Sequence, residues 1–229
     1  MRMAVMQPYL FPYVGYFQLI CASDFFVVYD DVAYIKNGYI NRNKIRSGTE
    51  SARFTIPVPG ASINKKIKDL NFSEDVGKVL KTLRYAYSKA PYYDAVYPMV
   101  ERVLTYKERS IGRLCKYSYD EICKYLEIGT NIELSSDLLY DRDSRAEDRL
   151  IDLCKRYSAT EYVNSEGGRH LYNKEHFSKH GVILYFLMPG EIKYNQGGKD
   201  FIKNLSIIDM LMWCPKEEIS QHLNCYQLE

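Results

Sequence analysis

The stretch at residues 3–31, MAVMQPYLFPYVGYFQLICASDFFVVYDD, predicts a strand, a helix and a second strand within about 30 residues. Residues 3–6 and 25–29 are short runs of mainly apolar side chains. Continuous apolar runs are typical of strands covered on both faces, as in a parallel sheet. Between them, residues 13–22 predict a helix with Gly15 in its first turn. We therefore expect a βαβ unit and a parallel α/β sheet.

The chain then leaves this pattern for about a hundred residues. Residues 32–60 contain short β-type runs separated by the turn signals Asn37-Gly38 and Ser47-Gly48, which predict a small antiparallel excursion. Residues 73–128 predict three amphipathic helices, with Ser73, Pro91 and Ser110 at their starts. Pro98 would kink or divide the second helix, and Gly129 would end the third.

The α/β alternation returns in the last hundred residues. Strands are predicted at residues 132–135, 161–164 and 182–187, with a short helix at 175–180. Ser144-x-x-Glu147 and Ser206-x-x-Asp209 have the spacing of capping boxes, which start helices. We expect one Rossmann-like domain over residues 1–229. Its mostly parallel sheet would be flanked by helices, with the β-rich excursion and the helical block inserted.

Composition indicates an ordinary globular protein of 229 residues, 46% hydrophobic and 26% charged. A formal net charge of +2 carries no strong signature of nucleic-acid binding. No apolar run approaches the roughly 18 residues of a membrane span, and residues 1–30 do not resemble a signal peptide. We expect a cytoplasmic protein. The six cysteines form no C-x-x-C pair and are expected to be reduced thiols, mostly buried.

The loop after the first predicted strand is the first candidate site. Ligands of parallel α/β sheets bind beyond the carboxyl ends of the strands, and the amino end of the following helix attracts phosphate. Gly15 allows a close approach, and four side chains offer hydrogen bonds or aromatic faces to a nucleotide or sugar: Gln7, Tyr9, Tyr13 and Tyr16. Composition supports equally a rigid hydrophobic plug that closes the end of the sheet.

A second cluster begins at Asp30 and Asp31, directly after the second predicted strand. Adjacent carboxylates there could hold Mg²⁺, or one of them could act as a general base. The residues that follow could bind phosphate, carboxylate or sugar hydroxyls: Tyr34, Lys36, Asn41, Arg42, Asn43 and Lys44. Turn capping by the acids and a solvated basic hairpin remain an equal alternative.

A third cluster follows the strand at residues 161–164. Glu166, Gly167 and Gly168 could form an anion-binding turn, and His170 is the histidine nearest to it. His176 and His180 have a helical i, i+4 spacing that could bind a metal ion. Their charged neighbours favour a solvated helix face, so no metal site is predicted.

Several motifs resemble the WbqC-like protein family. They are QPYLFPYVGYF at residue 7, DFFVVYDDVAY at 24, NRNKI at 41 and TIPV at 55, with KAPYY, YVNSEGG and LSIIDMLM further on. The resemblance implies a role in bacterial surface-polysaccharide (O-antigen) biosynthesis. The expected reaction is amide formation, by acyl or aminoacyl transfer to the amine of a nucleotide-linked amino sugar, with Asp30, Asp31 and His170 as candidate catalytic residues.

The opening also resembles the nucleotidylyltransferase superfamily. Residues 13–16 keep the glycine of its phosphate motif but neither histidine, and Ser206 takes the position of its second phosphate motif. This resemblance implies an alternative, activation of a sugar phosphate or small acid with a nucleoside triphosphate. The cofactor stays open across these interpretations, the candidates being ATP with Mg²⁺ and an acyl or aminoacyl donor. A non-catalytic binding protein is the third possibility, and the tyrosine-rich helices at 76–107 could form a homodimer face or belong to the core.

Overall fold

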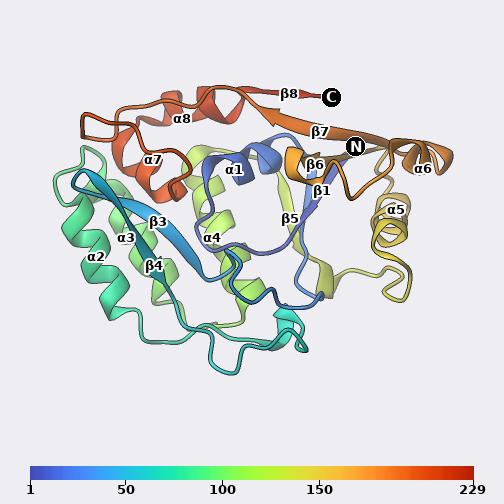
Figure 1. The fold of residues 1–229 in the computed structure, drawn as a ribbon, viewed down its shortest axis with the longest axis horizontal. Helices are drawn as coiled ribbons and strands as arrows, with labels where there is room; N and C mark the ends of the chain where they lie inside the picture. Colours follow the sequence, from blue (N-terminus) through green and yellow to red (C-terminus); the bar gives the residue numbers. More distant parts are fainter.

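The computed structural model describes residues 1–145 and 147–229 in full, and Ala146 only as the first residue of a helix. A six-stranded sheet has the order β5-β2-β1-β6-β7-β8 (Figure 1). Its strands are β1 (Arg2–Met6), β2 (Phe25–Val28), β5 (Asn131–Leu134), β6 (Glu161–Ser165), β7 (Ile183–Pro189) and β8 (Tyr226–Leu228). All neighbours are parallel except β8, which is antiparallel to β7. The predicted, mostly parallel α/β sheet is confirmed.

Both faces of the sheet are covered, which explains the continuous apolar runs. In β2, Phe25 and Val27 point into one hydrophobic cluster, while Phe26 and Val28 point into the other. Helices α5 (Ala146–Arg156) and α6 (Lys174–Lys179) cover the first face. Helices α1 (Val14–Cys21), α4 (Ile111–Leu126), α7 (Ile207–Trp213) and α8 (Lys216–Leu223) contribute to the second cluster. Successive side chains of such a strand point to opposite faces of the sheet, and both sets are therefore buried.

The excursion and the helical insertion are also confirmed. Strands β3 (Arg42–Ser47) and β4 (Glu50–Thr55) form an antiparallel hairpin, with Arg42 opposite Thr55 and Ser47 opposite Glu50. Helices α2 (Gly77–Tyr87) and α3 (Tyr93–Leu104) precede α4 and pack with the hairpin on one side of the molecule (Figure 1). Short 3₁₀ turns lie at Ile67–Asp69, Ser135–Asp137 and Glu166–Gly168.

Two predicted helix starts differ from the structure. Ser73 accepts a hydrogen bond from the amide of Asp75, as an N-cap would, but this bond closes only a local turn, and α2 begins at Gly77 after Val76. The hydroxyl of Ser144 hydrogen-bonds to Asp141, and Arg145 stands before α5 without a side-chain cap. Local competition of this kind is a general property of serine side chains.

The ends of the helical block also differ from prediction. Helix α4 ends at Leu126, because Glu127 adopts the left-handed conformation with φ of 61° before Gly129 is reached. Pro98 lies inside α3 and does not divide it.

Helix α8 and strand β8 were not predicted, since their short runs have no clear period. None of the described helices is long and apolar enough to cross a bilayer.

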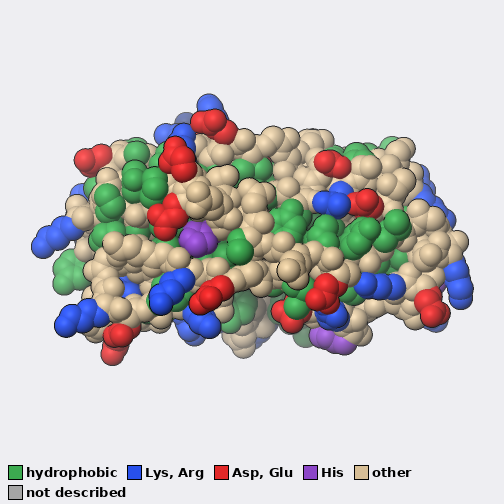
Figure 2. Space-filling view, turned by 90° about the horizontal axis from the view of Figure 1, so that it is seen from above, with side chains coloured by type: hydrophobic (Ala, Val, Ile, Leu, Met, Phe, Trp, Pro, Cys, Tyr) green, Lys and Arg blue, Asp and Glu red, His purple; other side chains and the backbone are tan. Residues whose placement is uncertain are grey.

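The surface above β7, β8 and α8 carries mixed charges. Figure 2 shows a band of hydrophobic side chains there, with acidic and basic groups scattered beside it. Neither sign of charge dominates this face, which agrees with the net charge of +2.

Of the cysteines, Cys115, Cys123, Cys154 and Cys214 are buried free thiols, as expected.

Candidate functional site

The opening loop is fixed by two segments that lie far away in the sequence. Phe11 has φ of 47°, in the left-handed region, which turns the loop sharply. Its carbonyl accepts hydrogen bonds from Asn43 Nδ2 at 2.6 Å and from Ser206 Oγ at 2.8 Å. The amide of Ile207 donates to the carbonyl of Pro12 at 2.7 Å. The hairpin and the start of α7 therefore hold the loop in place, and they use the predicted substrate ligands Asn43 and Ser206 to do so.

The side chains of this loop divide between core and surface. Leu10 and Phe11 are buried, and Tyr16 is buried with its hydroxyl donating to the carbonyl of Gln7 at 2.9 Å. Tyr9 and Tyr13 are half-buried, and burial raises the pKa of both phenols. The plug interpretation thus describes one half of the loop. The aromatic faces available to a ligand are those of Tyr9 and Tyr13.

A cavity of about 440 Å³ lies beside the first turn of α1. It is lined by Tyr13, Val14, Gly15 and Gln18 from the loop and α1, by residues 189–194 after β7, and by residues 201–207 and Met210 around the start of α7. The position fits the rule that ligands of parallel sheets bind beyond the carboxyl ends of the strands. Its volume also falls in the usual range of small-molecule sites.

Another cavity, of about 460 Å³, lies at the opposite end of the sheet. Its lining includes Asp24 just before β2 and Thr130 just before β5, so it faces the amino ends of the strands. That end of a parallel sheet is not where ligands usually bind. We therefore take the cavity beside α1 as the candidate site, although it is slightly smaller.

Gly15 leaves room for the ring of Tyr13. A Cβ atom at this position would lie 2.5 Å from Cε2 of Tyr13, whose ring folds back over the first turn of α1. The helix begins without a side-chain cap at Tyr13. Its first turn therefore has no side-chain acceptor, and an anionic ligand group could take that place.

Gln18 is an unpaired acceptor in the wall of this cavity. Its side chain is fully buried, and Nε2 donates to the carbonyls of His222 at 2.9 Å and Cys225 at 3.0 Å. Its Oε1 has no hydrogen-bond partner among the described residues. Leaving a buried acceptor unpaired costs about 1–3 kcal/mol. A ligand N–H or O–H group could remove that cost.

The far wall of the cavity combines aromatic and basic side chains. The hydroxyl of Tyr194 donates to Asp209 Oδ2 at 2.9 Å, and Tyr87 donates to Oδ1 of the same carboxylate at 2.7 Å. Burial raises the pKa of Asp209, whose carboxylate is inaccessible to solvent. Tyr194 also packs edge-on against Phe201, with ring centroids 5.4 Å apart. Lys193 and Lys203 are exposed beside these rings.

Asp30 and Asp31 lie in a different, solvent-excluded network. Oδ1 of Asp31 accepts from Ser135 Oγ at 2.6 Å and Tyr140 at 2.7 Å, and its Oδ2 accepts from Arg142 Nε at 2.6 Å. Burial alone would raise the pKa of Asp31, but these three donors outweigh it and lower the pKa. The side chain of Asp31 has no exposed surface.

For Asp30, the hydrogen-bond donors do not outweigh the effect of burial on the pKa. Asp30 accepts from the amide and the hydroxyl of Ser136, each at 2.9 Å, and burial still raises its pKa. Neither aspartate lines the cavity beside α1. The opening loop and the two aspartates, which the sequence offered as two candidate clusters, therefore do not share this cavity. Their catalytic roles stay predictions.

The other residues predicted in the second cluster lie outside the cavity beside α1. Tyr34 is buried and pairs with Asn41, whose Nδ2 donates to the carbonyl of Ile56 at 2.8 Å. Lys36 and Lys44 have exposed side chains, while Nε of Arg42 is buried and has no hydrogen-bond partner among the residues that the structure describes. None of these residues lines the cavity beside α1.

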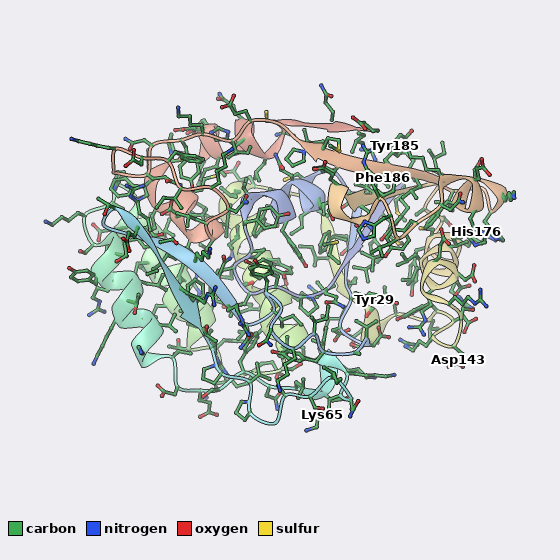
Figure 3. The ribbon with its side chains drawn as sticks, in the orientation of Figure 1. Tyr29, Lys65, Asp143, His176, Tyr185 and Phe186 are labelled. Atoms are coloured by element: carbon green, nitrogen blue, oxygen red, sulfur yellow. The ribbon has the colours of Figure 1, made fainter. Side chains whose placement is uncertain are left out.

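The turn after β6 is separate from the cavity. A Cβ at Gly168 would lie 2.9 Å from Asn164 Nδ2, so close packing explains this glycine. Glu166, Gly167 and His170 are exposed. Tyr29, at the end of β2 (Figure 3), has a buried hydroxyl without a hydrogen-bond partner among the described residues. These positions surround the carboxyl edge of the sheet without lining the cavity.

Most residues that line the cavity were missed by sequence reasoning, among them several with polar or aromatic side chains. Lys193, Tyr194, Phe201 and Lys203 belong to a segment without regular structure, where no period could place them. Gln18 did carry a signal. It is the one strongly polar side chain in the apolar helix sequence VGYFQLIC, and a polar group at such a position needs partners.

Comparison with known proteins gives two matches. The model of the WbqC-like protein family matches residues 7–221. A Mycobacterium tuberculosis protein named "Uncharacterized protein Rv1507c" is 29% identical over 215 residues, which cover 92% of each chain. No solved structure matches the chain.

Proposed function

Because the chain belongs to the WbqC-like protein family, which is associated with O-antigen biosynthesis, we propose that it forms an amide on a nucleotide-linked amino sugar. In this reaction the sugar amine attacks the carbonyl carbon of an acyl or aminoacyl donor. The new C–N bond forms, the donor's leaving group departs, and a general base takes the amine proton. The substrate would be a nucleotide-linked sugar of a bacterial surface polysaccharide.

The observation that supports this proposal most strongly is the composition of the cavity beside α1. Its basic groups, Lys193 and Lys203, suit a diphosphate, and the uncapped start of α1 suits an anion. Tyr194 and Phe201 offer aromatic surface for a base or a sugar ring. Oε1 of Gln18 is a buried acceptor that a ligand N–H or O–H group could reach only after a shift of the side chain. A nucleoside diphosphate sugar combines all three kinds of group.

The general base is proposed from the three sequence candidates. His170 has an exposed side chain, but it does not line the cavity beside α1. Asp30 has a raised pKa, which favours proton uptake, but its carboxylate is buried. Asp31 is held by Arg142 in its ionised form. A metal-dependent variant, with Mg²⁺ and ATP bound near these acids, would need the acids to exchange their present partners.

One observation favours the nucleotidyltransferase-like alternative. The parallel strands have the doubly wound order β5-β2-β1-β6-β7, and the starts of α1 and α7 meet at the cavity through a bridge between Tyr13 and Ser206. The start of α1, which has no side-chain cap from Tyr13, suits one phosphate of a triphosphate, whereas the first amides of α7 already donate to Pro12 and Ser206. Release of pyrophosphate from ATP in the presence of a small acid or a sugar phosphate would distinguish this activity from direct acyl transfer.

The proposal predicts that the two cavity lysines contribute to ligand binding. We expect the variant Lys193→Ala/Lys203→Ala to bind UDP-glucosamine, or its thymidine diphosphate counterpart, roughly 10–100-fold more weakly than the native protein. This corresponds to about 1.4–2.7 kcal/mol, since each lysine supplies one charge-assisted contact to phosphate. Isothermal titration calorimetry at fixed ionic strength measures the difference.

Lys199→Ala is the matched control, because Lys199 is also exposed in the same segment but does not line the cavity. It should bind like the native protein. Equal affinities for all three proteins would contradict the placement of the phosphates. Mass spectrometry after incubation with an acyl or aminoacyl donor tests the reaction itself. An amino sugar that binds but never gains an acyl group would indicate a binding protein.

A further inference from the structure

Two histidines and an aspartate come together where α6 faces α5, away from the cavity beside α1. His176 lies in α6 and His180 is the C-cap residue of the same helix, with ring centroids 5.0 Å from each other. Asp148 in α5 places Oδ1 2.8 Å from Nε2 of His176. One ligand atom from each of the three residues lies within 4.8 Å of the others. Figure 3 shows His176 in this position, between the two helices.

From this cluster we propose a binding site for a divalent transition metal, Zn²⁺ being the best fit. Two imidazole nitrogens and one carboxylate oxygen are common zinc ligands, and water can complete a tetrahedral set. Imidazole donors also favour zinc over the oxygen-seeking ions Mg²⁺ and Ca²⁺. The side chains of Asp148 and His176 are 45% and 37% exposed, so an ion can enter from solvent.

The three ligand atoms are close enough for small rotations to bring them onto one ion. Zinc bonds to nitrogen and oxygen are about 2.0–2.2 Å long, so ligand atoms around one ion lie well within 4.8 Å of each other. Partly exposed side chains can make such rotations at low cost. The site therefore requires no movement of α5 or α6.

One neighbour opposes the metal. Nζ of Lys155 lies 3.1 Å from Nδ1 of His180, and an ammonium group so close competes for the imidazole and repels a cation. Lys155 lies in α5, and its side chain must rotate away from His180 before an ion can bind there. The native site should therefore bind zinc with moderate affinity, and removal of this charge should tighten binding.

A bound ion would connect α5 to α6. Asn173 caps α6 by accepting from the amide of Glu175 at 2.8 Å, and its own amide donates to Glu147 Oε1 in α5 at 2.7 Å. The metal would add a second link between the same two helices. A ligand that binds only the folded state raises its stability by mass action.

The test is calorimetric titration of the metal-free full-length protein with ZnCl₂ in a non-chelating buffer. We expect one ion per chain, with His176→Ala and His180→Ala each weakening binding at least tenfold. Lys155→Met should tighten binding several-fold, and His170→Ala should bind zinc with the native affinity, because His170 is an exposed histidine outside the cluster. Melting curves in EDTA show whether each variant folds.

The result that supports the proposal is this combined pattern among variants that melt like the native protein in EDTA. If native zinc binding is absent, the proposal is wrong. It is equally wrong if binding survives in the double variant His176→Ala/His180→Ala, or if Lys155→Met weakens it. An added Asp148→Asn variant, which keeps the side-chain shape but removes the charge, should also lose affinity.

Discussion

Asp31→Ala is expected to lower the free energy of unfolding by about 3–5 kcal/mol, because it leaves the Arg142 guanidinium without its carboxylate in a largely buried network. Arg142 also donates to the carbonyls of Ser135 and Leu138, each within 3 Å, so it cannot leave without breaking further bonds. Its side chain is 33% exposed, which places the expected loss toward the lower end. Urea denaturation followed by circular dichroism measures this loss.

Two controls separate this effect from catalysis. Asp31→Ala/Arg142→Met removes both charges and should cost less than Asp31→Ala alone, since no uncompensated charge remains. Asp31→Asn keeps the shape of the side chain. If Asp31→Ala is as stable as the native protein and loses only turnover, the carboxylate serves the reaction and the structural explanation is wrong.

The pH dependence of the free energy of unfolding tests independently whether ionised Asp31 stabilises the folded protein. An unfolded aspartate titrates near pH 3.9, and the pKa of Asp31 in the folded protein is lower. Its ionised form therefore adds stability above about pH 4, and this contribution is lost as the pH falls through the folded-state pKa. The stability difference between the native protein and Asp31→Asn should accordingly shrink below pH 4.

Val14→Trp is expected to weaken binding of a nucleotide-linked amino sugar by at least about 100-fold, or 2.7 kcal/mol. Val14 is half-buried in the first turn of α1 and faces the cavity, so an indole there would occupy the space proposed for the ligand. The backbone of α1 can carry tryptophan without a large loss of helix propensity. Titration calorimetry with the same sugar nucleotides measures the change.

The matched control is Val14→Ala, which widens the cavity instead of filling it. It should retain binding within a few-fold of the native affinity. If Val14→Trp melts at the native temperature and still binds the ligand, the ligand lies elsewhere. Binding that is lost equally in both variants would indicate that Val14 matters for packing, not for access to the cavity.

The architecture could be predicted from the sequence because it depends on patterns within single elements. The apolar run at residues 25–29 indicated a strand covered on both faces, and β2 does bury both of its faces. The turn signal at Ser47-Gly48 correctly placed the hairpin of β3 and β4. Such patterns are local, so one sequence is enough to read them.

The candidate site could be predicted only in part, since its walls come from distant segments. The loop around Tyr13 and Gly15 was recognised, and it does form one wall of the cavity. The opposite wall, at residues 189–207, has no periodic pattern. The sequence around Asp31 does not indicate its ion pair with Arg142, which follows more than a hundred residues later. Tertiary partners of this kind decide whether a carboxylate is free or structurally bound.

The metal cluster shows the same limit. The spacing of His176 and His180 was visible in the sequence, but charged neighbours favoured a solvated helix face. Asp148 lies 28 positions before His176, and only the packing of α5 against α6 brings it into reach. A pair of histidines on one helix becomes a three-ligand set through a contact between elements.

The central claim, that the cavity beside α1 receives the nucleotide-linked sugar, is tested most directly by photoaffinity labelling. The native protein is irradiated with azido-base analogues of uridine and thymidine diphosphate amino sugars, and the labelled peptides are identified by mass spectrometry. We predict labelling within residues 13–18 or 189–210, suppressed by the unmodified sugar nucleotide. Competed labelling confined to residues 30–44 or 166–172, or labelling that no sugar nucleotide suppresses, would contradict the claim.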